Sequence, residues 1–110
     1  MADLPEGGEE MLGRLKVPAI VREDFERLVS ETAGGMWQRP GLAARERSIA
    51  TIAMLVALCR PEELREHIAF GLRNGLTREE ICEEILHCAV YAGFPAAVRA
   101  MDVAHEVFGE

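Results

Sequence analysis

Two consecutive helices that are marked at both ends constrain the fold of this 110-residue chain more than any other feature. Pro61 suits the first turn of a helix, where its missing N–H costs no hydrogen bond, and Asn74-Gly75 suits the end of that helix. Thr77-Arg78-Glu79-Glu80 is a capping box, so a second helix is predicted to begin directly after Thr77. Gly93 ends that helix. These marks predict a short apolar helical bundle.

Apolar periodicity predicts the other helices. One runs from residue 21 to about 32 and is expected to break at Ala33-Gly34-Gly35. Others run from about residue 43 to 59 and from 95 to about 108. No segment alternates convincingly as a strand does, and aromatic residues make up only 5% of the chain. The predicted fold class is therefore all-α.

The chain length predicts one domain. Residues 1–20 are expected to form a flexible N-terminal arm, because the first ten residues are polar and contain glycine. Residues 21–110 are expected to form a single helical domain.

Some apolar residues exceed what one small core needs. From Ile49 to Leu58 the helix is apolar on nearly every side, which indicates a central helix, a subunit interface, or both. Leu86 and Val90 add a second apolar patch to their helix.

The net charge of −7 argues against a nucleic-acid partner, which requires a basic surface. An anionic substrate would have to be held by local arginines. The longest apolar stretch, Ile49 to Cys59, is far too short to cross a membrane. Three cysteines without metal spacing suggest reduced thiols, and no signal peptide is visible, so a cytoplasmic location is expected.

Glu63 and His67 are one turn apart on the first of the two marked helices, and His67 lies at the edge of its apolar face. One interpretation is a carboxylate that orients an imidazole for proton transfer. The other is a surface ion pair, which spacing alone favours.

Other polar residues border the predicted core. Arg47 and Ser48 near the start of the apolar helix could bind a carboxylate, or could simply be solvated. His87 is more simply a rim or interface histidine. No metal site is predicted, because the histidines show no His-x-x-x-His spacing.

The stretch from residue 37 to residue 107 resembles the carboxymuconolactone decarboxylase family of the alkylhydroperoxidase-D-like superfamily, because it contains five matching strings in order. They are Trp37-Gln38-Arg39-Pro40-Gly41-Leu42, Arg45-Glu46-Arg47-Ser48, Glu63-Leu64-Arg65-Glu66-His67, Asn74-Gly75-Leu76-Thr77-Arg78-Glu79-Glu80-Ile81 and Leu86-His87-Cys88-Ala89-Val90-Tyr91-Ala92-Gly93-Phe94-Pro95-Ala96-Ala97.

The resemblance implies an alkylhydroperoxidase-D-like helical bundle that assembles into trimers or hexamers. It also implies cofactor-free decarboxylation of a carboxylated unsaturated lactone in aromatic catabolism. His67, with its imidazole oriented and its pKa adjusted by Glu63, would donate a proton to carbon. Five residues are candidates for binding the substrate. These are Trp37, Arg39, Arg47, Ser48 and His87.

The superfamily's peroxidases carry a Cys-x-x-Cys-x-x-x-His motif, in which Arg60 and Glu63 here replace the two cysteines, so dithiol chemistry is not expected. Ala33 and Val98 stand where the decarboxylases usually have Trp and Asn. Two alternatives therefore stay open. One is a related lyase, isomerase or cyclase acting on another acidic metabolite, for example in a biosynthetic pathway. The other is a non-catalytic oligomeric ligand-binding protein.

Overall fold

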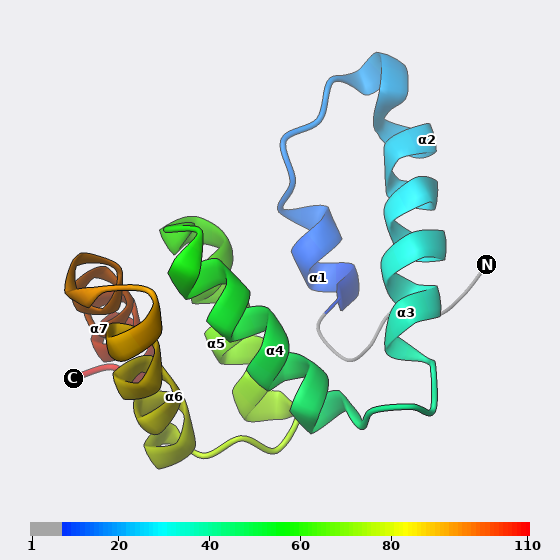
Figure 1. The fold of residues 1–110 in the computed structure, drawn as a ribbon. Helices are drawn as coiled ribbons and strands as arrows, with labels where there is room; N and C mark the ends of the chain where they lie inside the picture. The colour runs from blue at the N-terminus through cyan, green and yellow to red at the C-terminus, as the bar shows by residue number, and fades with distance from the viewer. Residues whose placement is uncertain (1–7) are drawn as a thin grey trace. The chain divides into compact units, whose positions relative to one another are not determined.

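A computed structural model describes residues 8–110 and divides the chain into two compact units, residues 1–43 and 44–110 (Figure 1). Within the described residues every regular element is a helix, so the all-α prediction is confirmed. The prediction of one domain over residues 21–110 stays a prediction, since the boundary between the two units falls inside that range. Among residues 8–110, no helix combines the length and apolar character needed to cross a membrane.

From residue 8 onward, the first unit contains four short helical elements: α1 (Gly8–Gly13), α2 (Ala19–Val29), η1 (Ser30–Gly34) and α3 (Gly35–Trp37). Helix α1 lies inside the segment that was predicted to be a flexible arm.

The predicted break at Ala33-Gly34-Gly35 is wrong. The backbone passes through a π-helical turn, η1, and continues directly as α3. Gly34 and Gly35 keep ordinary helical dihedrals, with φ of −59° and −61°. Glycine weakens a helix by about 1 kcal/mol, which is too little to stop one by itself.

The second unit contains four longer helices: α4 (Ala44–Ala57), α5 (Pro61–Arg73), α6 (Arg78–Tyr91) and α7 (Phe94–Phe108). The marked boundaries are confirmed. Thr77 accepts a hydrogen bond from the Glu80 N–H at 3.0 Å, and the Glu80 carboxylate accepts one from the Thr77 N–H at 2.9 Å. Gly75 follows α5 with φ of +100°, a conformation that favours glycine.

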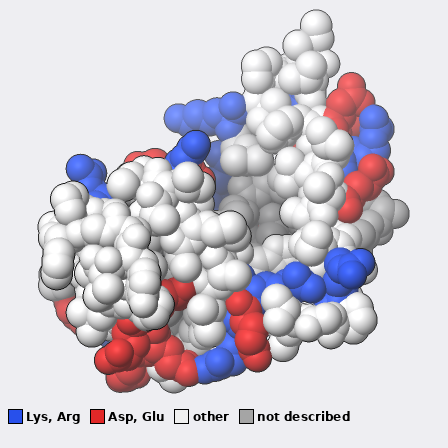
Figure 2. Space-filling view, viewed as in Figure 1, with Lys and Arg blue, Asp and Glu red and all other residues white. Residues whose placement is uncertain are grey.

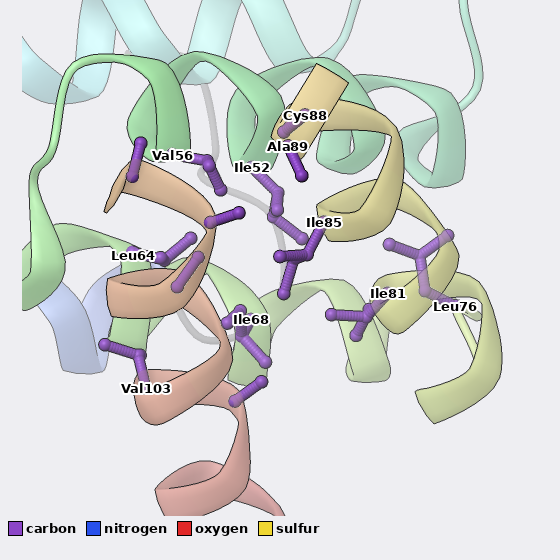
Figure 3. Packing of buried hydrophobic residues seen from close by; sticks show 14 of the residues in the cluster. Ile52, Val56, Leu64, Ile68, Leu76, Ile81, Ile85, Cys88, Ala89 and Val103 are labelled. Carbon is purple, nitrogen blue, oxygen red and sulfur yellow. The ribbon is translucent and has the colours of Figure 1, made fainter. Parts of the chain in front are cut away.

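The core of the second unit lies between its four helices (Figure 3). Isoleucines from three helices, Ile52 of α4, Ile68 of α5 and Ile81 and Ile85 of α6, are fully buried. Burying one such side chain contributes roughly 1.5–3 kcal/mol. Helix α4 packs against α5, α6 and α7, so it contacts every other helix of the second unit.

Helix α4 buries only one face within its unit. Ser48, Ile52 and Val56 are buried, whereas Met54 is 56% exposed. Leu58, just after the helix, is also mostly exposed. Of the two explanations for this helix's apolar surplus, packing inside the unit accounts for one face only.

Candidate active site

Helices α4 and α5 approach closely where α5 carries Gly71. A Cβ atom on Gly71 would lie 3.1 Å from Cδ1 of Ile52 and 3.7 Å from Cβ of Ser48, both on α4. It would also lie 3.0 Å from Cδ1 of Leu76. The missing side chain therefore lets α5 pack directly onto α4, and we call the line of contact the α4–α5 seam.

Ser48 lies in this seam and is only 2% exposed. Its Oγ accepts a hydrogen bond of 2.9 Å from Nδ2 of Asn74, the residue that follows the last turn of α5. Ser48 was predicted as a substrate-binding residue, whereas Asn74 was not. In the sequence, Asn74-Gly75 was interpreted only as the end of a helix. Nothing in the sequence indicated that Asn74 contacts α4.

His67 is half-buried one turn before Gly71. Its ring lies beside that of Phe70, with the centroids 5.8 Å apart. Burial lowers the pKa of His67 below its usual value, while the carboxylates of Glu66 and Glu63, in that order, raise it. The imidazole is therefore mainly neutral at pH 7 in the unliganded chain.

Glu63 is exposed on α5. Within residues 8–110 it is not joined to His67 by a hydrogen bond or an ion pair. Its effect on His67 is through charge alone and is smaller than that of Glu66. A role for Glu63 in tuning the imidazole thus stays a prediction, and Glu66 shares it.

The other predicted site residues are spread over the chain. Arg47 is half-buried on α4, directly before Ser48. His87 is exposed on α6, where its ring lies 5.0 Å from that of Tyr91. Trp37 and Arg39 belong to the first unit. The structure thus places Arg47 and Ser48 together on one helix, and it gives no contact between His87 and His67.

Glu84 of α6 has a buried carboxylate and was not predicted from the sequence as a site residue. Both carboxylate oxygens are inaccessible to solvent and have no hydrogen-bond partner among residues 8–110. Burial raises the pKa of Glu84 to about 7, and the backbone of Ala53 on α4 lowers it slightly without meeting hydrogen-bond geometry. Burial, and then the charge of Glu84, raise the pKa of the Cys88 thiol as well. The only sequence signal was a Glu one turn before Cys88, at the border of the apolar stripe.

The raised pKa of Glu84 predicts that the folded protein is more stable in mild acid than above pH 7. The folded chain keeps the Glu84 proton up to about pH 7, whereas an unfolded chain releases it near its ordinary value of 4.5. Stability from this group is therefore complete below about pH 4.5 and is lost as the pH rises through 7. We expect a loss of about 1–2 kcal/mol, because Glu84 as a whole is only half-buried although its carboxylate oxygens are not accessible.

Urea unfolding at pH 5 and pH 8 checks this expectation. The Glu84→Gln variant should show a smaller fall in unfolding free energy between the two pH values than the wild type. Equal falls in the two proteins would show that Glu84 is ionised in the folded state.

Two surface hollows, of about 470 and 650 Å³, lie along α7 and share Val98 and Asp102 in their walls. Neither is lined by a predicted site residue. Glu84 and His87 have the Glu-x-x-His spacing of some metal sites, but no three acidic, His or Cys side chains in residues 8–110 converge to hold an ion.

Among residues 8–110, these features define an all-helical fold in which a half-buried histidine on α5 and an arginine and a buried hydroxyl on α4 belong to one packed helix pair. Residues 23–106 match the model of the carboxymuconolactone decarboxylase family. The chain therefore belongs to the carboxymuconolactone decarboxylase family.

Three relatives show how the family varies around this chain. It is 49% identical over 87 residues to a 4-carboxymuconolactone decarboxylase of Acinetobacter baylyi, a match that covers 78% of this chain and 65% of that protein. It is 37% identical over 105 residues to a nitrosuccinic acid decarboxylase of Metarhizium robertsii, covering 94% of this chain and 73% of the relative. An uncharacterized 15.0 kDa protein of Paracoccus denitrificans is 32% identical over 97 residues, or 86% of this chain and 69% of its own length. The chain thus spans about two thirds of the length of the Acinetobacter protein.

Proposed function

We propose that this protein removes CO2 from a small organic acid without a cofactor and then protonates the carbon that CO2 has left. The observation that carries the proposal is the 49% identity to a 4-carboxymuconolactone decarboxylase over 78% of the chain. A second relative is also named a decarboxylase, although its acid is different. Family membership and the two names support a carbon–carbon lyase.

The two named acids share one chemical property. Loss of CO2 from either leaves an electron pair that can spread onto oxygen, in the unsaturated lactone through its carbonyl and in nitrosuccinic acid through its nitro group. A 4-carboxymuconolactone-like lactone from aromatic catabolism is our first candidate substrate, because that relative is the more similar. A nitro acid or another activated acid is the second, because the match to the nitrosuccinic acid decarboxylase covers more of this chain.

The site residues can be assigned to the steps of such a reaction. Arg47 or Arg39 would hold a carboxylate by paired hydrogen bonds. As the C–C bond breaks, its electron pair moves onto the substrate oxygen, which Ser48 or His87 would stabilise by donating a hydrogen bond. His67 would then give a proton to carbon. Trp37 would supply apolar contact with the substrate.

The lowered pKa of His67 fits this order of events. The free imidazole is mainly neutral, but an anionic substrate bound beside it would raise its pKa and favour proton uptake. Proton donation would then be linked to substrate binding.

A turnover assay tests the proposal. The wild-type protein is mixed with 4-carboxymuconolactone and, separately, with nitrosuccinic acid, and CO2 release and product are followed. CO2 release from either acid above the uncatalysed rate supports a decarboxylase and identifies the substrate class. If both acids are inert but a small acid raises the melting temperature, the related lyase, isomerase or cyclase is favoured. If neither turnover nor binding occurs, a non-catalytic role replaces the proposal.

We also propose that the protein assembles into a homo-oligomer. Five large apolar or aromatic side chains on α6 and α7 are at least half exposed: Leu86, Val90, Tyr91, Phe94 and Val98. Figure 2 shows a broad uncharged area over these helices, with acidic side chains gathered toward the beginning of α6. Exposed apolar areas of this kind mark interaction sites.

Arginine at position 90 is expected to disrupt this assembly, because a charge would be buried against apolar side chains without a partner. Light scattering of Val90→Arg should give a mass closer to the 12.1 kDa of one chain than the wild type does. Glu83→Arg, an exposed substitution on the same helix, is the matched control and should keep the wild-type mass. Monomeric wild-type protein, or unchanged assembly in Val90→Arg, would contradict the proposal.

A further inference from the structure

Among residues 8–110, the structure gives no acceptor for the hydroxyl proton of Ser48. A serine inside a helix often donates its hydroxyl hydrogen to the carbonyl four residues earlier. Thr51 on the same helix does this, with its Oγ1 2.9 Å from the carbonyl oxygen of Arg47. Within the described part of the chain, the Ser48 hydroxyl makes no such bond. The one hydrogen bond that its oxygen forms is accepted from Nδ2 of Asn74. Because Ser48 is almost fully buried, this leaves a desolvated donor that is available to another group.

Backbone hydrogen bonds fix the position of Asn74 at the end of α5. Its backbone N–H donates to the carbonyl oxygens of Phe70 and Gly71, at 3.0 and 3.1 Å. The N–H of Leu76 also returns to the Gly71 carbonyl, at 3.0 Å. The dihedrals of Asn74, φ −86° and ψ 8°, can be adopted by most residues. The side chain can therefore be replaced without backbone strain.

Asn74 and His67 lie on the same side of α5. Residues 67, 71 and 74 are separated by four and three positions, so they share one face of the helix, and Gly71 shows that this face meets α4. Seven residues of helix correspond to about 10 Å along the axis. The imidazole therefore lies on the same side of α5 as the amide that bonds to Ser48, about two turns away from it.

We infer that Asn74 is a positioning residue for the Ser48 hydroxyl. Its amide N–H occupies one lone pair of Ser48 Oγ, and the hydroxyl proton is thereby directed toward the substrate oxygen that receives the electrons left by CO2. The inference rests on the proposed decarboxylase function. Of the two candidate donors to the substrate oxygen, Ser48 and His87, the inference selects Ser48. It also adds Asn74 as the residue that orients the Ser48 hydroxyl.

The isosteric variant Asn74→Asp is the sharpest test. Aspartate keeps the shape of the side chain, but its oxygens cannot donate, so the Ser48 hydroxyl must turn and donate to them. We expect kcat for CO2 release to fall about 10- to 100-fold in Asn74→Asp, with KM within about threefold of the wild type, because a donor to the transition state is removed. Asn74→Ala should also lower kcat, since the hydroxyl is no longer oriented.

A double-mutant cycle separates orientation from general damage. In the Ser48→Ala background, Asn74→Ala should cause no further fall in kcat. Thr77→Ala is the matched stability control, because it removes the capping box next to Asn74 without touching Ser48, and it should keep wild-type kcat while lowering the melting temperature.

Three results would overturn the inference while leaving the decarboxylase proposal intact: wild-type kcat in Asn74→Asp, wild-type kcat in Ser48→Ala, or multiplicative losses in the double mutant. A folded wild-type protein that releases no CO2 from either acid would overturn both proposals, and its inertness distinguishes that case.

Discussion

Replacing His67 with alanine is expected to lower kcat for CO2 release by about 10²- to 10⁴-fold, the usual contribution of a positioned proton donor. The imidazole is half-buried beside Phe70, so water cannot easily replace it as a donor to carbon. Measurement of kcat and KM on the substrate that the wild type accepts checks the expectation. The rate of substrate consumption and the rate of formation of the protonated product should decline together.

His67→Gln is the matched control, because the amide keeps an N–H donor but cannot transfer a proton. It should be as impaired as His67→Ala. In the wild type, kcat/KM should be higher near pH 5.5 than near pH 7.5, since burial lowers the pKa of His67 and the protonated form is the active one. Normal turnover in His67→Ala would remove the histidine from the mechanism, and recovery in His67→Gln would reduce its role to hydrogen bonding.

Gly71→Val should destabilise the second unit by about 2–3 kcal/mol, near the upper end of the range for overpacked cores. Even a Cβ would lie within 3.1 Å of methyl groups of Leu76 and Ile52, and the two γ-carbons of valine need more room than that. Relief would require α5 to move away from α4, which would separate Asn74 from Ser48. We therefore expect kcat to fall as well, and urea unfolding together with the CO2 assay measures both effects.

Gly71→Ala provides the size control. The terminal methyl groups around its Cβ can shift by a few tenths of an ångström, and alanine favours helix over glycine by about 0.8–1 kcal/mol. The two effects nearly cancel, so stability should change by less than about 1 kcal/mol. Equal destabilisation by alanine and valine would mean that backbone conformation, rather than space, selects glycine at this position.

The helices of the second unit were predictable because local signals mark their ends. Pro61, the capping box at Thr77 and the glycines at 75 and 93 act within a few residues, and each holds in the structure. The same rule failed at Gly34, where it predicted a break, because the glycine keeps helical dihedrals among its helical neighbours and the chain continues as a helix.

The site was less predictable because its geometry comes from contacts between distant residues. Ser48 and Asn74 are 26 positions apart, and only the packing of α5 on α4 joins them. The burial of Glu84 likewise depends on where α6 meets Ala53 of α4. The resemblance to the family selected His67 and Ser48, but neither spacing nor resemblance indicates which hydrogen bonds they make.

Helix α4 has a further consequence for how this chain can change in length. It meets α5 through Ser48 and Ile52, and it meets α6 through Ala53 and through the ion pair of Arg45 with Glu80. One residue inserted after Ser48 would rotate everything beyond it by about 100°, so the contacts before and after the insertion could not be kept together. Insertions and deletions among relatives should therefore fall between the helices, such as at residues 58–60, and the 14-residue length of α4 should stay constant.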